Sequence, residues 1–175
     1  MTCAEIRRQP VQCCAGATVA DLLECLIQIR ALEETPRRLQ RLLESTTPSA
    51  WQRPGPRGGP APAEYLAELV ARERSLARRL LAAFGGDAGE PPSVGDPAEV
   101  ASPTGRATAF AALRAVTLAV LAERSAGELG APMPGEAGSG AVLADLVAQV
   151  VAWDTECLAE IRAALDQVAA PQGGA

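Results

Sequence analysis

Residues 143–165 have the sequence LADLVAQVVAWDTECLAEIRAAL, and this stretch decides the fold class. Its apolar residues recur every three or four positions, which is the spacing of one face of an α-helix and not of a β-strand. The residues on this face are Leu143, Leu146, Val147, Val150, Cys157, Leu158, Ile161, Leu165 and, just beyond the stretch, Val168. We therefore predict a long amphipathic helix from about residue 139 to about residue 168.

Three segments upstream share this helical periodicity. Pro36 interrupts the first of them, so we expect either one kinked helix or two helices joined near residue 35. The three segments are 18–45, from Pro62 or Ala63 to the glycine pair at 85–86, and 105–128. Four amphipathic helices without strand-like alternation predict an all-α chain folded as a four-helix bundle.

Stretches rich in Pro and Gly separate the predicted helices. Long loops are expected between the first and second helices, over 46–61, and between the second and third, up to residue 104. The second loop exceeds the usual helix connection, so it is either a crossover or a functional flap. A further Gly/Pro break covers 130–140. The domains predicted are an irregular lead-in over 1–17, one bundle over 18–168 and a flexible tail over 169–175.

Composition excludes several kinds of chemistry. The 175 residues contain no His, which rules out an imidazole base, a Ser-His-Asp triad and a His-ligated metal. Lys is absent too, so all 16 basic residues are Arg, and neither a Schiff-base lysine nor a P-loop lysine is available. This bias is typical of the codon usage of a GC-rich bacterium.

Charge and cysteine content narrow the class of protein further. The formal net charge is −5 and the isoelectric point is about 4.9, with no basic arm, so we expect no nucleic-acid partner. Uninterrupted apolar runs are only a few residues long, so we expect no membrane span. The five Cys form no repeated CxxC spacing, which favours a reduced, cytoplasmic protein.

Several polar residues fall on helix faces that are expected to be buried. Glu73 lies on the apolar face of the second helix, Asp154 lies beside that of the fourth, and Arg114 shares a face with apolar residues of the third. A buried carboxylate is costly unless it is paired. We therefore expect either a structural ion pair with an arginine such as Arg72 or Arg114, or a solvated pocket. The Arg-rich stretch 72–79 is otherwise expected to be a solvated helix face.

An adjacent line on the fourth helix carries Gln149, Trp153 and Cys157 at positions i, i+4 and i+8. Trp153 is either a core residue or a platform on which a ligand stacks. Cys157 is either an inert small apolar residue or a reactive thiol. The sequence pattern alone leaves both alternatives open.

The order of these segments resembles the DinB/YfiT-like superfamily. The resemblance rests on PAEYLAELVARE (62–73), FAALRAVTLAVLAE (110–123) and the stretch 143–165, with LEETPRRLQRLLES (32–45) similar to the family's first helix. It implies a four-helix bundle, often a homodimer, that holds a divalent metal through three His at one end. It also implies a thiol-dependent S-transferase or isomerase that uses mycothiol, bacillithiol or glutathione.

This chain carries other residues where the resemblance implies metal-binding histidines. Glu68 stands at the ligand position of the second helix, and Trp153 and Cys157 stand at those of the fourth. Tryptophan cannot ligate a metal, and one carboxylate with one thiolate makes a weak site unless a neighbouring side chain assists. The candidates for such assistance are Glu156, Asp154 and Gln149. We expect no metal and no other cofactor in this site.

Three functions remain open. The first is the binding or conversion of a small organic molecule in a metal-free cavity lined by Glu68, Trp153 and Cys157. There, Glu68 would act as a general acid or base because burial favours its protonated form, and Trp153 would stack on an unsaturated ligand. Arg72 or Arg114 would neutralise an anionic ligand. The second function is thiol-dependent S-transfer or isomerisation with an altered metal site, and the third is a non-catalytic bundle for dimerisation or partner binding.

Overall fold

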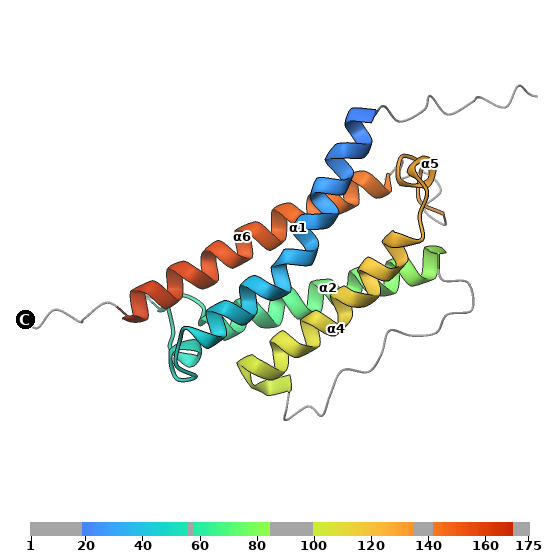
Figure 1. The fold of residues 1–175 in the computed structure, drawn as a ribbon. Helices are drawn as coiled ribbons and strands as arrows, with labels where there is room; N and C mark the ends of the chain where they lie inside the picture. Colours follow the sequence, from blue (N-terminus) through green and yellow to red (C-terminus); the bar gives the residue numbers. More distant parts are fainter. Residues whose placement is uncertain (1–18, 56–57, 85–99, 135–141, 170–175) are drawn as a thin grey trace, which may run out of the picture.

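The computed structural model describes residues 19–55, 58–84, 100–134 and 142–169. Figure 1 shows four long helices that form a bundle: α1 (Val19–Glu44), α2 (Pro62–Phe84), α4 (Pro103–Ala122) and α6 (Leu143–Ala169). In the described parts of the connections, two short helices lie between them: η1 (Ala50–Gln52) and α5 (Ala126–Leu129). Within the described ranges the only β-type pairing is an isolated bridge between Pro132 and Val142. The prediction of an all-α four-helix bundle is confirmed.

Each long helix packs against two of the other three. α4 lies beside α1 and α2, and α6 lies beside the same two helices. α1 and α6 run in one direction and α2 and α4 in the other (Figure 1), so α2 ends at the opposite end of the bundle from the start of α4. The crossover or flap predicted between α2 and α4 lies mostly outside the described residues, as do the predicted lead-in and the predicted tail beyond Ala169.

α1 is one helix that continues through Pro36, and Figure 1 shows that it bends along its length. Proline has no N–H, so the carbonyl of Leu32, four residues earlier, loses its helical partner. Arg114 of α4 donates a hydrogen bond from Nη1 to that carbonyl over 3.2 Å. Of the two alternatives, the single bent helix forms, and a neighbouring helix satisfies the carbonyl that proline leaves free.

Two helix boundaries differ from the sequence prediction by more than two residues. The third helix does not continue to residue 128, because α4 ends at Ala122 and α5 starts after Ser125. Ser125 and Glu128 form a capping box, in which Glu128 Oε2 accepts hydrogen bonds from the Ser125 N–H over 2.8 Å and from its Oγ over 2.7 Å. This cap starts a separate helical turn. The fourth helix begins at Leu143 rather than near residue 139.

Apolar side chains form two clusters, one towards each end of the bundle. The first is built around Leu39, Leu66, Phe110 and Ile161, and the second around Leu32, Leu80, Leu121 and Leu143. Both clusters take side chains from α1, α2, α4 and α6, which is the packing that amphipathic faces predict. Buried polar side chains lie between them and are described with the site below.

Trp51 is a core residue that the sequence analysis assigned to a loop. The 3₁₀ helix η1 turns its side chain into the first cluster, where only 1% of the residue is exposed. Its indole Nε1 donates a hydrogen bond to Thr46 Oγ1 over 2.8 Å, which satisfies the one polar atom of the ring. The part of the predicted loop from residue 46 to residue 55 therefore contributes to the core and is not simply a linker.

α4 is long and apolar enough to cross a membrane, with a mean hydropathy of 1.4. Among the described helices it alone has that character, which the short apolar runs in the sequence did not indicate. Its buried side chains include Arg114 and Thr117 beside apolar residues. A helix that packs on two neighbours and contributes to both core clusters is apolar for that reason.

Replacing Trp51 by alanine tests its role in the core. We expect the free energy of unfolding to fall by about 3–5 kcal/mol, because a large buried ring is removed and a cavity remains. The matched control is Trp153→Ala, which removes a partly exposed ring and should change stability by no more than about 1 kcal/mol. Urea unfolding followed by circular dichroism measures both variants. Equal losses in the two variants would contradict the assignment of Trp51 to the core.

Candidate functional site

Arg114 lies at the centre of the bundle, between the two apolar clusters, and is 1% exposed. Its Nη2 donates a hydrogen bond to Glu73 Oε2 over 2.7 Å, and its Nη1 donates one to Asp154 Oδ2 over 2.8 Å. Nη1 also reaches the Leu32 carbonyl. One guanidinium group on α4 therefore holds a polar group from each of the other three long helices.

The electrostatics of this ion cluster, formed by Glu73, Arg114 and Asp154, follow from its burial. Glu73 is 2% exposed and Asp154 4% exposed, and Thr117 donates a hydrogen bond to Glu73 Oε1 over 2.5 Å. Desolvation alone would lower the pKa of Arg114, but Glu73 and then Asp154 raise it above its ordinary value. Arg114 therefore stays charged. Glu73 and Asp154 therefore form the ion pair that was one of the two predicted alternatives, and their partner is Arg114 and not Arg72.

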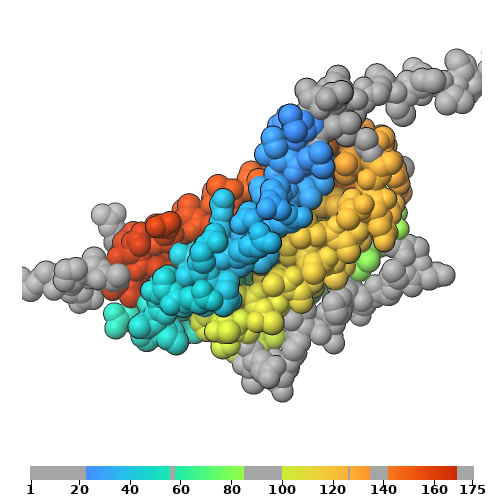
Figure 2. Space-filling model, viewed as in Figure 1, coloured from blue at the N-terminus to red at the C-terminus, as the bar shows by residue number. Residues whose placement is uncertain are grey.

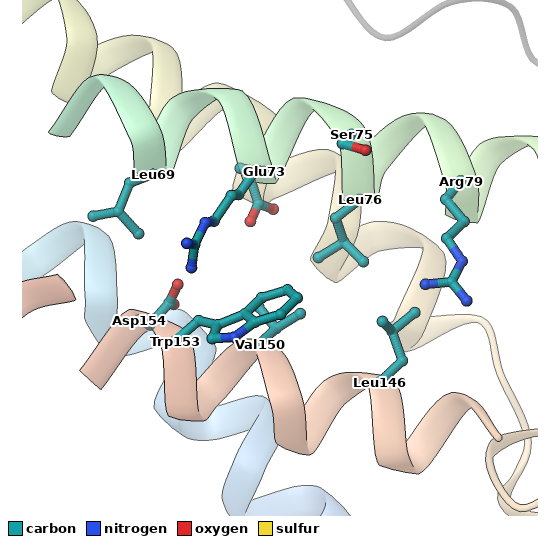
Figure 3. A pocket seen from close by; sticks show the side chains of 10 residues that line it. Leu69, Glu73, Ser75, Leu76, Arg79, Leu146, Val150, Trp153 and Asp154 are labelled. Atoms are coloured by element: carbon teal, nitrogen blue, oxygen red, sulfur yellow. The ribbon is translucent and has the colours of Figure 1, made fainter. Parts of the chain in front are cut away.

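A pocket of about 230 Å³ lies beside the ion cluster, between α2 and α6. Figure 3 shows the indole of Trp153 reaching from α6 into the space between the two helices. The apolar lining residues are Leu69, Leu76, Leu146 and Val150, and the polar ones are Arg72, Glu73, Ser75, Arg79 and Asp154. The pocket thus combines an aromatic ring, an apolar wall and two arginines with the carboxylates of the ion cluster.

Trp153 and Arg72 form one edge of this pocket. Trp153 is 37% exposed, and the guanidinium carbon of Arg72 lies 5.0 Å from its ring centroid, which is a cation–π distance. Arg72 Nη2 also lies 2.5 Å from Glu68 Oε1. The side chains of both members of this ion pair are about half exposed, so the pair contributes at most about 1 kcal/mol. Arg72 can therefore leave Glu68 and pair with another anion at a small cost in free energy.

Cys157 lies near the pocket but does not line it. Its thiol is half-buried and donates a hydrogen bond to the Tyr65 carbonyl over 3.4 Å. Desolvation and then the Glu68 carboxylate raise the pKa of Cys157 to about 12. The thiol is therefore protonated at neutral pH, which makes it a poor nucleophile and a poor metal ligand.

The structure places the expected site residues differently from the sequence analysis. Of Glu68, Trp153 and Cys157, only Trp153 lines the pocket, and Glu68 is exposed rather than buried beside the indole. Arg114 does not line the pocket and its charge is already shared by two carboxylates, so it is not placed to neutralise a ligand. Gln149 and Glu156 are exposed and lie outside the pocket wall.

The sequence analysis missed Arg79 and Ser75 as pocket residues. Both belong to the stretch 72–79, which was expected to be a solvated face. The available signal was the spacing of 69, 72, 76 and 79 along α2, which puts these positions on one side of the helix. Because arginines are common on exposed helix faces, that spacing alone does not distinguish a pocket edge from a solvated surface.

The residues at the positions implied by the resemblance do not fit a divalent metal. Trp153 offers no ligand atom, the Glu68 carboxylate is paired with Arg72, and the Cys157 thiol keeps its proton. In the part of the chain that the structure describes, no three His, Cys, Asp or Glu side chains come together in a way that could hold a metal ion. The side chains at these three positions therefore do not form the divalent-metal site that the resemblance implies.

Comparison with known proteins agrees with the architecture. The sequence model of the DinB superfamily matches residues 31–154, a range that contains the complete Arg114 ion cluster and the carbonyl of Leu32. No curated protein and no solved structure matches the chain.

Replacing Arg114 by methionine tests the ion cluster. We expect a loss of about 3–5 kcal/mol in the free energy of unfolding at pH 7, because two carboxylates stay buried without a counter-ion. Adding Glu73→Gln and Asp154→Asn to this variant should recover part of the loss, since both unpaired charges are then removed. The matched control is Arg72→Met, which breaks an exposed pair and should cost less than about 1 kcal/mol. Urea unfolding of the wild type and of these three variants supplies the free energies, and a similar loss from Arg114→Met and Arg72→Met would contradict the account.

The raised pKa of Cys157 predicts slow alkylation. At pH 8 only about one thiol in 10⁴ is ionised if its pKa is about 12. We expect iodoacetamide to modify Cys157 in the folded protein more than about 100-fold more slowly than in urea-unfolded protein, which is the internal control. Mass spectrometry of the peptide that contains Cys157 measures both rates. Rapid labelling in the folded state would show a reactive thiol and would favour thiol chemistry.

Proposed function

We propose that this chain, which belongs to the DinB superfamily, binds a small aromatic or otherwise unsaturated organic acid, without a metal ion. The proposed site is the pocket between α2 and α6. The observation that carries the proposal is the shared lining of this pocket, where an indole ring, an apolar wall and two guanidinium groups meet in one space. Such a combination of an apolar surface with a few polar groups is typical of small-molecule sites.

The volume of the pocket limits the size of the ligand. A cavity of about 150 Å³ holds one benzene molecule. The volume of about 230 Å³ therefore suits a substituted single ring or a small fused ring, rather than a long chain or a nucleotide. The pocket is smaller than the range of roughly 300–1,000 Å³ in which drug-sized ligands bind.

The charges around the pocket determine how an acid would lie in it. One guanidinium, that of Arg114, faces two carboxylates in the inner wall, so this wall carries an excess of formal negative charge when both are ionised. Arg72 and Arg79 supply positive charge to the lining from α2. A ligand would therefore direct its carboxylate to the arginines, its ring to Trp153, and any N–H or O–H donor to Glu73 or Asp154.

Binding is favoured over conversion because the pocket offers no uncommitted acid or base. Glu73 and Asp154 are both held by Arg114, and Glu68 lies outside the pocket. General acid–base catalysis needs a group within hydrogen-bond reach of the proton it moves. Thiol transfer would need an activated sulfur, and the Cys157 thiol, which lies near the pocket, is protonated and donates its hydrogen bond to a backbone carbonyl.

Titration with indole-3-carboxylate tests the proposal. We expect saturable binding in isothermal calorimetry, weaker by about tenfold for the uncharged indole-3-carboxamide because the charge-assisted hydrogen bonds to arginine are lost. Trp153→Ala should weaken binding by removing the stacking surface. Ser75→Trp should abolish it by filling the pocket from an exposed position on the pocket edge.

Thr104→Trp is the matched control, since it adds the same ring at an exposed position of α4 outside the pocket. It should leave the affinity unchanged. Binding that survives Ser75→Trp would place the ligand elsewhere. No binding by indole-3-carboxylate or by any of a panel of single-ring and fused-ring aromatic acids would contradict the proposed function.

A further inference from the structure

A groove of about 520 Å³ lies between α1 and α6, on the other side of α6 from the pocket between α2 and α6. Figure 2 shows the face of the molecule on which these two helices lie side by side. Its lining residues are Arg38, Arg41, Leu42 and Ser45 at the end of α1, and Thr155, Leu158, Ala159 and Arg162 on α6. We call it the arginine groove, after its three arginines.

The three arginines of this groove have no carboxylate partner among the described residues. The ion pairs between described residues use Arg30, Arg37, Arg72, Arg114 and Arg124 instead. The nearby acidic residues of α1 are directed elsewhere: Glu34 pairs with Arg37 over 2.6 Å, and Glu44 accepts a hydrogen bond from Gln40 over 2.9 Å. On α6, Asp166 follows one turn after Arg162 and does not line the groove.

The three guanidinium groups are exposed and lie around one groove without a carboxylate partner among the described residues, which gives this face a local positive charge in a chain whose net charge is −5. Arg41 lies in the last turn of α1, where a cation complements the helix dipole. That effect explains one arginine and not the other two. Arg38 lies one turn before Arg41 on α1, and Arg162 lies more than one turn before the end of α6. Neither is therefore in the last turn of its helix.

We propose that the arginine groove binds a small, multiply charged oxyanion, such as a diphosphate or a polycarboxylate. Guanidinium groups form paired hydrogen bonds with phosphate and carboxylate oxygens, so three of them in one groove can hold two charged groups of the same ligand. The hydroxyl groups of Ser45 and Thr155 add polar atoms to the lining, and Leu42 and Leu158 provide an apolar strip for the carbon part of the ligand. This site is separate from the pocket between α2 and α6 and does not depend on its function.

Calorimetric titration with inorganic pyrophosphate and with citrate, at constant ionic strength, tests the arginine groove. We expect one binding site per chain and no binding of acetate, which carries a single charge. Arg38→Gln and Arg162→Gln should each weaken binding by about tenfold, because each removes charge-assisted hydrogen bonds. The more tightly bound of the two anions identifies the ligand as a phosphate or a carboxylate compound.

The matched control is Arg37→Gln, which removes the same charge from the residue before Arg38 on α1, a residue that does not line the groove. It should change the affinity by less than about twofold, since Arg37 does not line the groove and its charge is already paired with Glu34. Three results would overturn the proposal: no saturable binding of either anion, equal effects of Arg37→Gln and Arg38→Gln, or binding only of a long polymer such as heparin. The last result would indicate a macromolecular partner instead.

Discussion

A single buried guanidinium connects the four long helices of this bundle. Arg114 of α4 pairs with Glu73 of α2 and Asp154 of α6, and it bonds the α1 carbonyl that Pro36 leaves without a helical partner. Replacing such a cluster by apolar residues is often neutral or stabilising, so we do not attribute the stability of the fold to it. We infer that it contributes to the register of the helices instead, because apolar stripes alone tolerate sliding by a helical turn, whereas sliding any one helix would separate Arg114 from a buried partner.

The same layer explains why a pocket lies beside it. Glu73 and Asp154 face Arg114 on one side and the space between α2 and α6 on the other. If apolar side chains filled that space, the remaining lone pairs of the Glu73 and Asp154 carboxylates would have no hydrogen-bond donor, which is unfavourable. A ligand with a donor group satisfies them, and the ring of Trp153 and the arginines of α2 complete the lining. The interaction that fixes the fold and the proposed binding site are therefore parts of one arrangement.

Helical periodicity was sufficient to predict the four helices, and it also placed Glu73, Arg114 and Asp154 on inward faces. What it could not predict depends on contacts between segments. Whether α1 breaks at Pro36 depends on a donor from α4, and the burial of Trp51 depends on a turn within a Pro/Gly-rich stretch. The grouping of Glu68 with Cys157 came from the resemblance to a metal-binding family and not from packing. On α2, Glu68 lies one position from Leu69, and that rotation places it outside the pocket.

A crystal structure of the protein grown with indole-3-carboxylate tests the central claim most directly, which is that the space beside the Arg114 layer accepts an organic acid. The account predicts the ring against Trp153 and the carboxylate within hydrogen-bond distance of Arg72 or Arg79, with the ion cluster unchanged. A pocket closed by the Trp153 side chain with the ligand elsewhere would contradict it. A metal ion bound by Glu68 and Cys157 would contradict it as well.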